Sequence, residues 1–177
     1  MASFELSAFE VVQDIAIVAA IEIPRSGIIK TGFWINDPEH KIVWPPAQDE
    51  IGRQDYLWQN TCFELFIGVK EQDYYREINL TPTAWQAYAF EEYRFPEDIP
   101  PQPAQDITLL ELQRTPFGLT AVIDINAFLH AEQLKMSHLF LGLTAVITTA
   151  QKQHFFAMQH SSPQADFHNK RDWLYEP

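Results

Sequence analysis

Two glutamates and an asparagine in the middle of the chain have the clearest capacity for chemistry. Glu64, Glu77 and Asn79 lie in segments that alternate as β-strands do, and side chains two positions apart share a face of a strand. Pairing of the two segments as neighbours would bring the three together. Two carboxylates side by side can act as acid and base in glycoside hydrolysis, at a separation of about 5 to 9.5 Å. They can equally bind ligand hydroxyl groups, so both interpretations stay open.

Arginines offer a structural explanation of the same acids. A buried carboxylate without a cation is costly, so Glu64 and Glu77 could each be held by an arginine. A planar guanidinium can bind both oxygens of a carboxylate. Arg53 and Arg94 are therefore expected to balance the two acids or to bind an anionic group of a ligand, and Arg76 is a further candidate partner.

Aromatic residues surround these acids in the sequence. The face of an aromatic ring can meet the C–H bonds of a sugar, and the ordinary alternative is packing in the core or against a ring on the next strand. Tyr75 and Tyr88 are expected on the face that carries the acids. Trp58 and Trp85 are expected to supply ring contacts to a ligand.

A group of potential metal ligands lies near the C-terminal end of the sequence. His160, Asp166 and His168, together with Glu64 or Glu77, could hold calcium or another divalent ion. Their spacing matches no established zinc pattern, and the alternative is a turn with ordinary hydrogen bonds. No methionine or histidine stands out as a ligand for haem. No other cofactor is expected.

The elements that must position these residues are three consecutive antiparallel strands over 61–67, 74–80 and 85–92. Turn signals recur every 8 to 12 residues along the chain, and helical periodicity is almost absent. This pattern predicts an all-β antiparallel sandwich formed by one domain over 1–177. Further strands are predicted over 3–9, 15–23, 28–35, 41–44, 107–113, 119–125, 139–148 and 154–159, with a helix over 126–134 capped by Asn126 and a proline-rich crossing loop over 95–103.

Composition narrows the classes of partner. The 177 residues carry a formal net charge of −12, which repels nucleic acid and anionic membrane surfaces. The single cysteine, Cys62, is expected to be a small buried side chain and allows no intrachain disulfide. No signal peptide is recognised, and the longest apolar run, 15–21, is too short to span a bilayer. A cytoplasmic protein is the expectation.

Several stretches resemble a known group of proteins. The segments LWQNTCFELF (57–66), YREINLTP (75–82) and WQAYAFEEYR (85–94), with the tail over 157–168, resemble the bacterial DOMON-like proteins, which are related to family 9 carbohydrate-binding modules. The resemblance covers most of the chain from Arg53 onward. It implies a jelly-roll β-sandwich with a concave ligand face. Family 9 modules bind sugar chain ends between rings, often with a structural calcium, whereas other DOMON domains bind haem.

The function expected from these observations is non-catalytic binding of a small polar ligand, preferentially a sugar, on the concave face. One alternative is a sugar-acting hydrolase or isomerase with Glu64 and Glu77 as acid and base; the absence of a glycine-rich phosphate loop and of a nucleophile elbow lowers the prospect of an enzyme. Another is a protein-interaction module with exposed rings. The expected ligand-binding residues are Arg53, Trp58, Glu64, Tyr75, Glu77, Asn79, Trp85, Tyr88 and Arg94.

Overall fold

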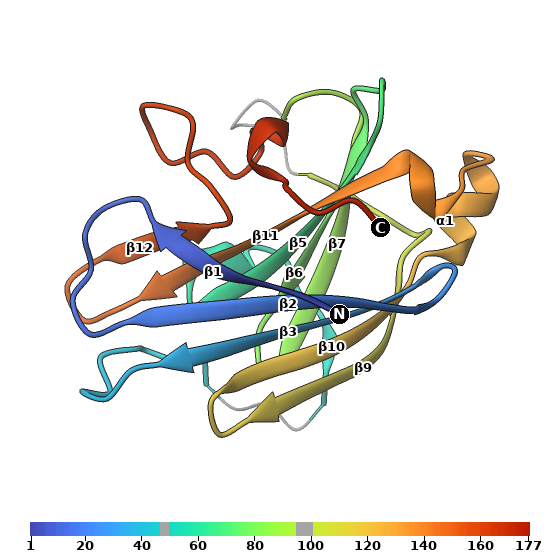
Figure 1. Ribbon diagram of the computed structural model, residues 1–177. Coiled ribbons are helices and arrows are strands. Elements are labelled where there is room, and N and C mark those ends of the chain that lie inside the picture. The colour runs from blue at the N-terminus through green and yellow to red at the C-terminus, as the bar shows by residue number, and fades with distance from the viewer. Residues whose placement is uncertain (47–49, 95–100) are drawn as a thin grey trace.

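The computed structural model describes residues 1–46, 50–94 and 101–177, and in these residues eleven strands follow one hydrogen-bonded path while a twelfth pairs beside it (Figure 1). The path curls into two facing layers, which confirms the all-β prediction. The first layer has the order β1 (Ala2–Ala8), β2 (Ala16–Arg25), β3 (Ile28–Asn36), β10 (Gly118–Asp124) and β9 (Thr108–Thr115). The second has the order β12 (Gln153–Ala157), β11 (Leu139–Thr148), β5 (Cys62–Val69), β6 (Tyr75–Leu80), β7 (Ala84–Phe90) and β4 (Gly52–Arg53), with β8 (Gln102–Pro103) also paired to β7.

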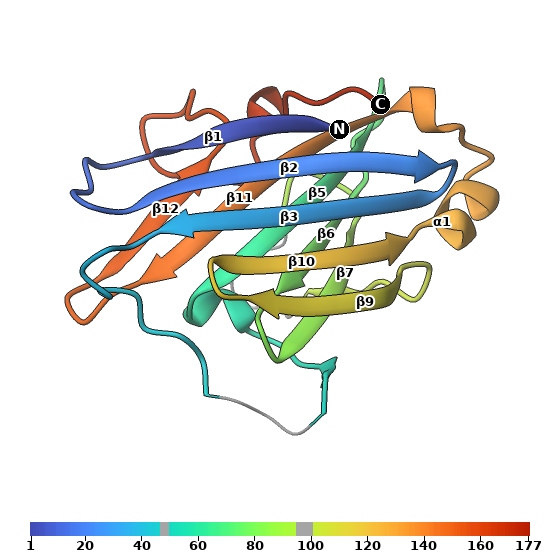
Figure 2. The same cartoon turned by 60° about the horizontal axis from the view of Figure 1, so that its bottom comes forward.

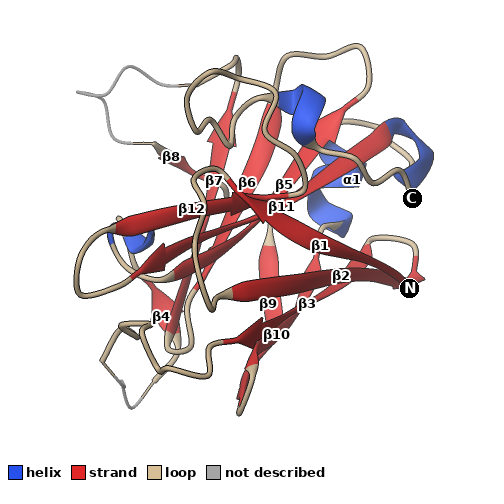
Figure 3. Ribbon diagram, turned by 60° about the vertical axis from the view of Figure 1, so that its left-hand side comes forward, coloured by secondary structure: helices blue, strands red, loops and turns tan. Residues whose placement is uncertain are grey.

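The two layers are joined where β1 pairs with β12 through Ser7 with Ala157 and Ala8 with Phe156. Figure 2 shows the first layer lying across the strands of the second. Every described pairing between these strands is antiparallel except that of β4 with β7. The helices are short and lie outside the layers (Figure 3): α1 (Asn126–Ala131), η1 (Leu57–Gln59), η2 (Met136–His138) and η3 (Lys170–Asp172).

The hydrophobic core fills the space between the layers. Alternation along β5 points Phe63, Leu65 and Ile67 toward the first layer, and all three are fully buried. The ring of Phe33 on β3 meets that of Phe63, with 4.9 Å between the ring centroids. This apolar core fixes the register of β5 to β7, because a slip of one residue would turn the polar face inward.

The outer face of the second layer is buried as well, because the C-terminal segment covers it (red in Figure 1). Tyr175 exchanges two backbone hydrogen bonds with Leu141, at 2.7 and 3.1 Å. The Trp173 ring stacks on Phe66 at 5.0 Å and lies over Gly142, where an added Cβ would come within 2.3 Å of Trp173 Cδ1. A glycine at this position therefore lets the segment lie against the sheet.

Three local predictions need correction or lie outside the described residues. The segment 41–44 forms only an isolated bridge, from Ile42 to Thr149, because the chain leaves the sheet again at once. The helix begins with Ile125 as its N-cap, since the Asp124 carboxylate already accepts the Asn126 N–H at 2.8 Å. Residues 95–100 of the proline-rich loop are outside the described part. Among the residues described, no helix has the length and apolar character needed to cross a membrane.

Candidate functional site

Glu64, Glu77 and Asn79 lie together on the outer face of the second layer, and we call them the polar cluster. Glu64 is paired in register with Asn79, whose Nδ2 donates to Glu77 Oε1 at 2.8 Å. Thr144, the partner of Glu64 on β11, donates its hydroxyl to Glu64 Oε2 at 2.7 Å. The prediction that alternation and hairpin pairing bring these three residues together is confirmed.

The polar cluster is buried, which differs from the open hollow expected. Glu64 is 3% exposed, Glu77 is 5% exposed and Asn79 is fully buried. The expectation was wrong because strand alternation predicts which side chains share a face and not what covers that face. Here the C-terminal segment, with Trp173 and His168, lies over it.

No arginine or lysine forms an ion pair with either acid within the described residues, so the expected counter-ions are wrong. Arg53 instead donates to Gln86 Oε1 at 2.9 Å and to a backbone carbonyl at 3.0 Å. Arg94 is exposed and holds its guanidinium 5.3 Å from the ring centre of Tyr93. The two acids thus share a buried site without a compensating cation.

This burial controls the protonation of the acids. Removal from water raises the pKa of Glu77 to about 7, although the hydrogen bond from Asn79 opposes the shift. Burial, followed by repulsion from Glu77, raises the pKa of Glu64 well above its ordinary value, and the hydroxyl of Thr144 opposes this. The polar cluster therefore retains protons at pH values where ordinary glutamates have lost them.

His168 lies beside Glu77 and is the more exposed of the two. Its Nδ1 lies 2.6 Å from the hydroxyl of Tyr75, and its Nε2 lies 3.8 Å from Glu77 Oε2. Burial lowers the pKa of His168 to about 4, so the imidazole is neutral at pH 7 and supplies no positive charge to Glu77. Its side chain is 22% exposed against 7% for that of Glu77.

The predicted metal-ligand group is not assembled. His160 Nε2 lies 2.9 Å from the carbonyl oxygen of Ser7, whereas His168 faces Tyr75. Asp166 accepts from the backbone N–H of His168 at 3.2 Å and binds the hydroxyl of Tyr93. The part of the chain that the structure describes holds no cluster of three or more His, Cys, Asp or Glu side chains suited to a metal ion.

The predicted rings divide between the two faces of the layer. Tyr75 and Tyr88 lie on the face of the polar cluster, and the Trp58 ring from η1 meets Tyr88 at 5.7 Å. Trp85 is on the opposite face, against the core, with the Arg53 guanidinium 4.3 Å from its ring centre. The expectation that Trp85 supplies a ring contact beside the polar cluster is wrong, because Gln86 and Tyr88 are the residues of β7 that share the face of the cluster.

Two exposed rings at the edge of this face were missed. Tyr56 is 46% exposed and Tyr93 is 49% exposed. Tyr56 packs on Trp58 with 5.4 Å between ring centroids and has a φ of 61°, which is unusual for a bulky residue and stores strain. Asp55, next to it, accepts from the hydroxyl of Tyr88 at 2.9 Å. No sequence pattern indicated a left-handed backbone here.

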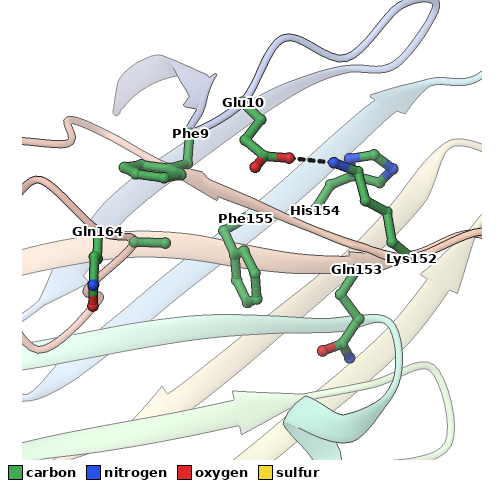
Figure 4. Close-up of a pocket in the computed structure, with 8 residues that line it drawn as sticks. Phe9, Glu10, Lys152, Gln153, His154, Phe155 and Gln164 are labelled. Atoms are coloured by element: carbon green, nitrogen blue, oxygen red, sulfur yellow. Dashed lines mark hydrogen bonds and ion pairs between the residues drawn. The ribbon is translucent and has the colours of Figure 1, made fainter.

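A hollow of 320 Å³ lies at the β12 end of the same layer (Figure 4). Phe155 belongs to the outer face, because it pairs with Val146, which in turn pairs with Cys62 on β5. The alternation of β12 could have indicated this ring, but not the loop that closes the hollow. The hollow is lined by Phe9, Glu10, Lys152, Gln153, His154, Phe155, Gln164 and Ala165.

The burial of Glu64 and Glu77 limits what the two acids could do in hydrolysis. A glycosidase needs its two carboxyl groups on either side of the bond that is cleaved, with the sugar between them. Glu64 and Glu77 instead lie on neighbouring strands of one buried floor. The protonated carboxyl groups and the amide of the polar cluster can donate and accept hydrogen bonds, while the rings around them provide apolar contact.

A comparison with solved structures supports the fold. A crystal structure of a putative carbohydrate-binding protein from Bacteroides uniformis matches with a TM-score of 0.62 and 15% sequence identity, over 96% of this chain and 84% of that chain. No family model and no curated protein matches the sequence. At this identity the likeness shows that the two proteins share an all-β fold.

Proposed function

We propose that this protein binds a carbohydrate without catalysis, on the outer face of the second layer. The sugar lies where Trp58 is half-buried and Tyr56 and Tyr93 are exposed, so that rings meet its C–H surface. The polar cluster lies beneath, and the side chain of His168, which is 22% exposed, lies 3.8 Å from Glu77 at the edge of the C-terminal segment. The acidic surface makes the ligand neutral or cationic.

One observation carries this proposal. Asn79 Oδ1 is fully buried and has no hydrogen-bond partner among the described residues, and it lies beside two carboxyl groups that lack a cation. A buried acceptor without a partner costs about 1 to 3 kcal/mol. Buried polar atoms in the interior of a protein almost always have a hydrogen-bond partner, so one without a partner needs an explanation. A site that binds a polar ligand provides one, because the ligand can supply the missing hydrogen bond.

Two further points agree with a sugar. The all-β protein from Bacteroides uniformis is named for carbohydrate binding, although the likeness is one of fold. The stretches over 57–66, 75–82 and 85–94 resemble DOMON-like proteins and family 9 carbohydrate-binding modules. We therefore also propose that the fold is a jelly-roll sandwich related to these modules. Because Cys62 has no second cysteine with which to form a disulfide, we also propose a cytoplasmic location.

The test is a thermal-shift screen against monosaccharides and disaccharides, followed by calorimetric titration of each sugar that raises the melting temperature. Glu64→Gln should weaken binding about tenfold and leave the protein folded, because the amide keeps an acceptor for the Thr144 hydroxyl. Phe117→Ala, at a 67% exposed ring outside this site, is the matched control and should bind as the wild type does.

Two results would contradict the proposal. If no neutral sugar raises the melting temperature of the wild type, carbohydrate binding is wrong. If Glu64→Gln unfolds the protein, the carboxyl group is part of the structure, and the site is misplaced.

A further inference from the structure

We propose that the hollow beside β12 is a second sugar subsite, so that the ligand is an oligosaccharide and not a single sugar. This inference rests on the proposed function and adds the class of ligand. It depends on the position of the hollow, on its contacts with the first site and on the chemistry of its lining.

The hollow and the polar cluster lie on one continuous face. Glu64 pairs with Thr144 on β11, and Thr144 pairs with Ala157 on β12, so the face runs unbroken across these strands. Phe155, two residues from Ala157, points to the same side. Three strand spacings separate β12 from β6, which is about 14 Å and exceeds the width of one sugar ring.

Two sets of contacts connect the hollow to the first site. Gln153, in the wall of the hollow, donates to the backbone oxygen of Trp58 at 3.1 Å, and the ring of Trp58 meets Tyr88. On the other side Phe155 meets Phe167 with 5.9 Å between ring centroids, next to His168. A ligand that extends along Trp58 therefore reaches Gln153 in the wall of the hollow.

The lining suits a neutral sugar unit. The rings of Phe9 and Phe155 provide apolar surface, and the amide of the exposed Gln164 lies beside them (Figure 4). The only charges in the lining, those of Glu10 and Lys152, form an ion pair with each other, so the hollow has no net preference for an ionic group. Its volume of 320 Å³ falls within the range of small-molecule sites, about 300 to 1,000 Å³.

The experiment measures affinity against chain length. Cello-, xylo- and malto-oligosaccharides of one to six units are titrated calorimetrically into the wild type, Phe155→Ala, Gln164→Trp and Glu64→Gln. In the series that binds, wild-type affinity should rise about tenfold between one unit and the longest oligomer, as expected for covering an aromatic side chain. Phe155→Ala should remove that rise and leave the affinity for one unit unchanged.

Gln164→Trp fills the hollow from an exposed loop position and should have the same effect as Phe155→Ala without a risk to folding. Glu64→Gln should weaken binding of every length. If wild-type affinity is the same for all lengths, or if both hollow variants bind long oligomers as the wild type does, the second subsite is wrong while sugar binding stands. If no sugar of any length binds, the proposed function is wrong, and the second subsite is wrong with it.

Discussion

The buried charged residues on the two faces of β6 have opposite surroundings, since one has a partner of opposite charge and the other does not. On one face Arg76, 6% exposed, makes three hydrogen bonds to the carboxylate of Asp106, the shortest at 2.7 Å, and its guanidinium lies 4.5 Å from the ring centre of Phe128. On the other face, one residue along the strand, Glu77 lies beside Glu64 with no arginine or lysine paired to either among the described residues.

The difference separates a structural role from a binding role. Where β6 needs a charge for its packing, the fold supplies the opposite charge with good geometry, and neither group is left unpaired. Where it carries Glu77, the fold supplies an amide and a neutral imidazole but no cation, and burial raises the carboxyl pKa although the amide opposes the shift. The burial of Glu77 and Glu64 without a cation therefore lowers the stability of the fold, as is common for residues that serve binding.

The largest effect is expected from breaking the structural pair. Arg76→Met keeps a long apolar stem over Phe128 but leaves the partly buried Asp106 without its cation, and should destabilise the protein by about 3 kcal/mol in chemical denaturation. The double variant Arg76→Met with Asp106→Leu should recover most of this loss. Equal destabilisation in the single and double variants would show that the pair is not what stabilises this face.

A smaller effect of opposite sign is expected on the other face. Glu77→Gln keeps an oxygen for the Asn79 amide and removes the buried acid. It should stabilise the protein, by about 2 kcal/mol more at pH 8 than at pH 5. The measurement is chemical denaturation of the wild type and the variant at both pH values.

The sign follows from the pKa of Glu77, which folding raises from 4.5 to about 7. The native protein keeps a proton that the unfolded chain releases, so this stabilisation is complete below pH 4.5 and is lost as the pH rises through 7. His168 acts in the opposite sense: its pKa falls from 6.5 to about 4, so its contribution is complete above pH 6.5 and is lost as the pH falls through 4. A variant that is destabilised equally at both pH values would place Glu77 among the structural groups.

The smallest effect is expected at an exposed ion pair, which sharpens the contrast between the two buried faces. Lys70 Nζ lies 2.7 Å from Glu176 Oε2, but the two side chains are 42% and 67% exposed. Lys70→Met should change stability by less than about 0.5 kcal/mol, because solvent screens the pair. A loss as large as that of Arg76→Met would mean that this pair anchors the C-terminal segment.

The sequence was sufficient to place the polar cluster. Glu64, Glu77 and Asn79 lie on segments whose alternation is clear, and short turns make those strands neighbours, so local pattern and pairing together fix the face. The same alternation placed Tyr75 and Tyr88 correctly and should have placed Trp85 on the other side. Trp85 was assigned by residue type against the evidence of its position in the strand.

What covers the polar cluster could not be predicted. Residues about 100 positions apart in sequence meet there, as Phe66 and Trp173 do, and no local pattern encodes such a contact. The reach of Arg53 toward Gln86 and a carbonyl, in place of an acid, likewise depends on how the chain before β5 returns to the sheet. Burial and counter-ions are tertiary properties, and the pKa values follow from them.

The pairing of Tyr175 with Leu141 has a consequence for the order in which the protein is made. The ribosome releases β5, β6 and β7 roughly a hundred residues before the C-terminal segment that covers them. Until that segment emerges, Glu64 and Glu77 face water and can ionise as ordinary glutamates do. Docking of the last residues on the sheet is therefore coupled to proton uptake, because burial is what raises the pKa of Glu77.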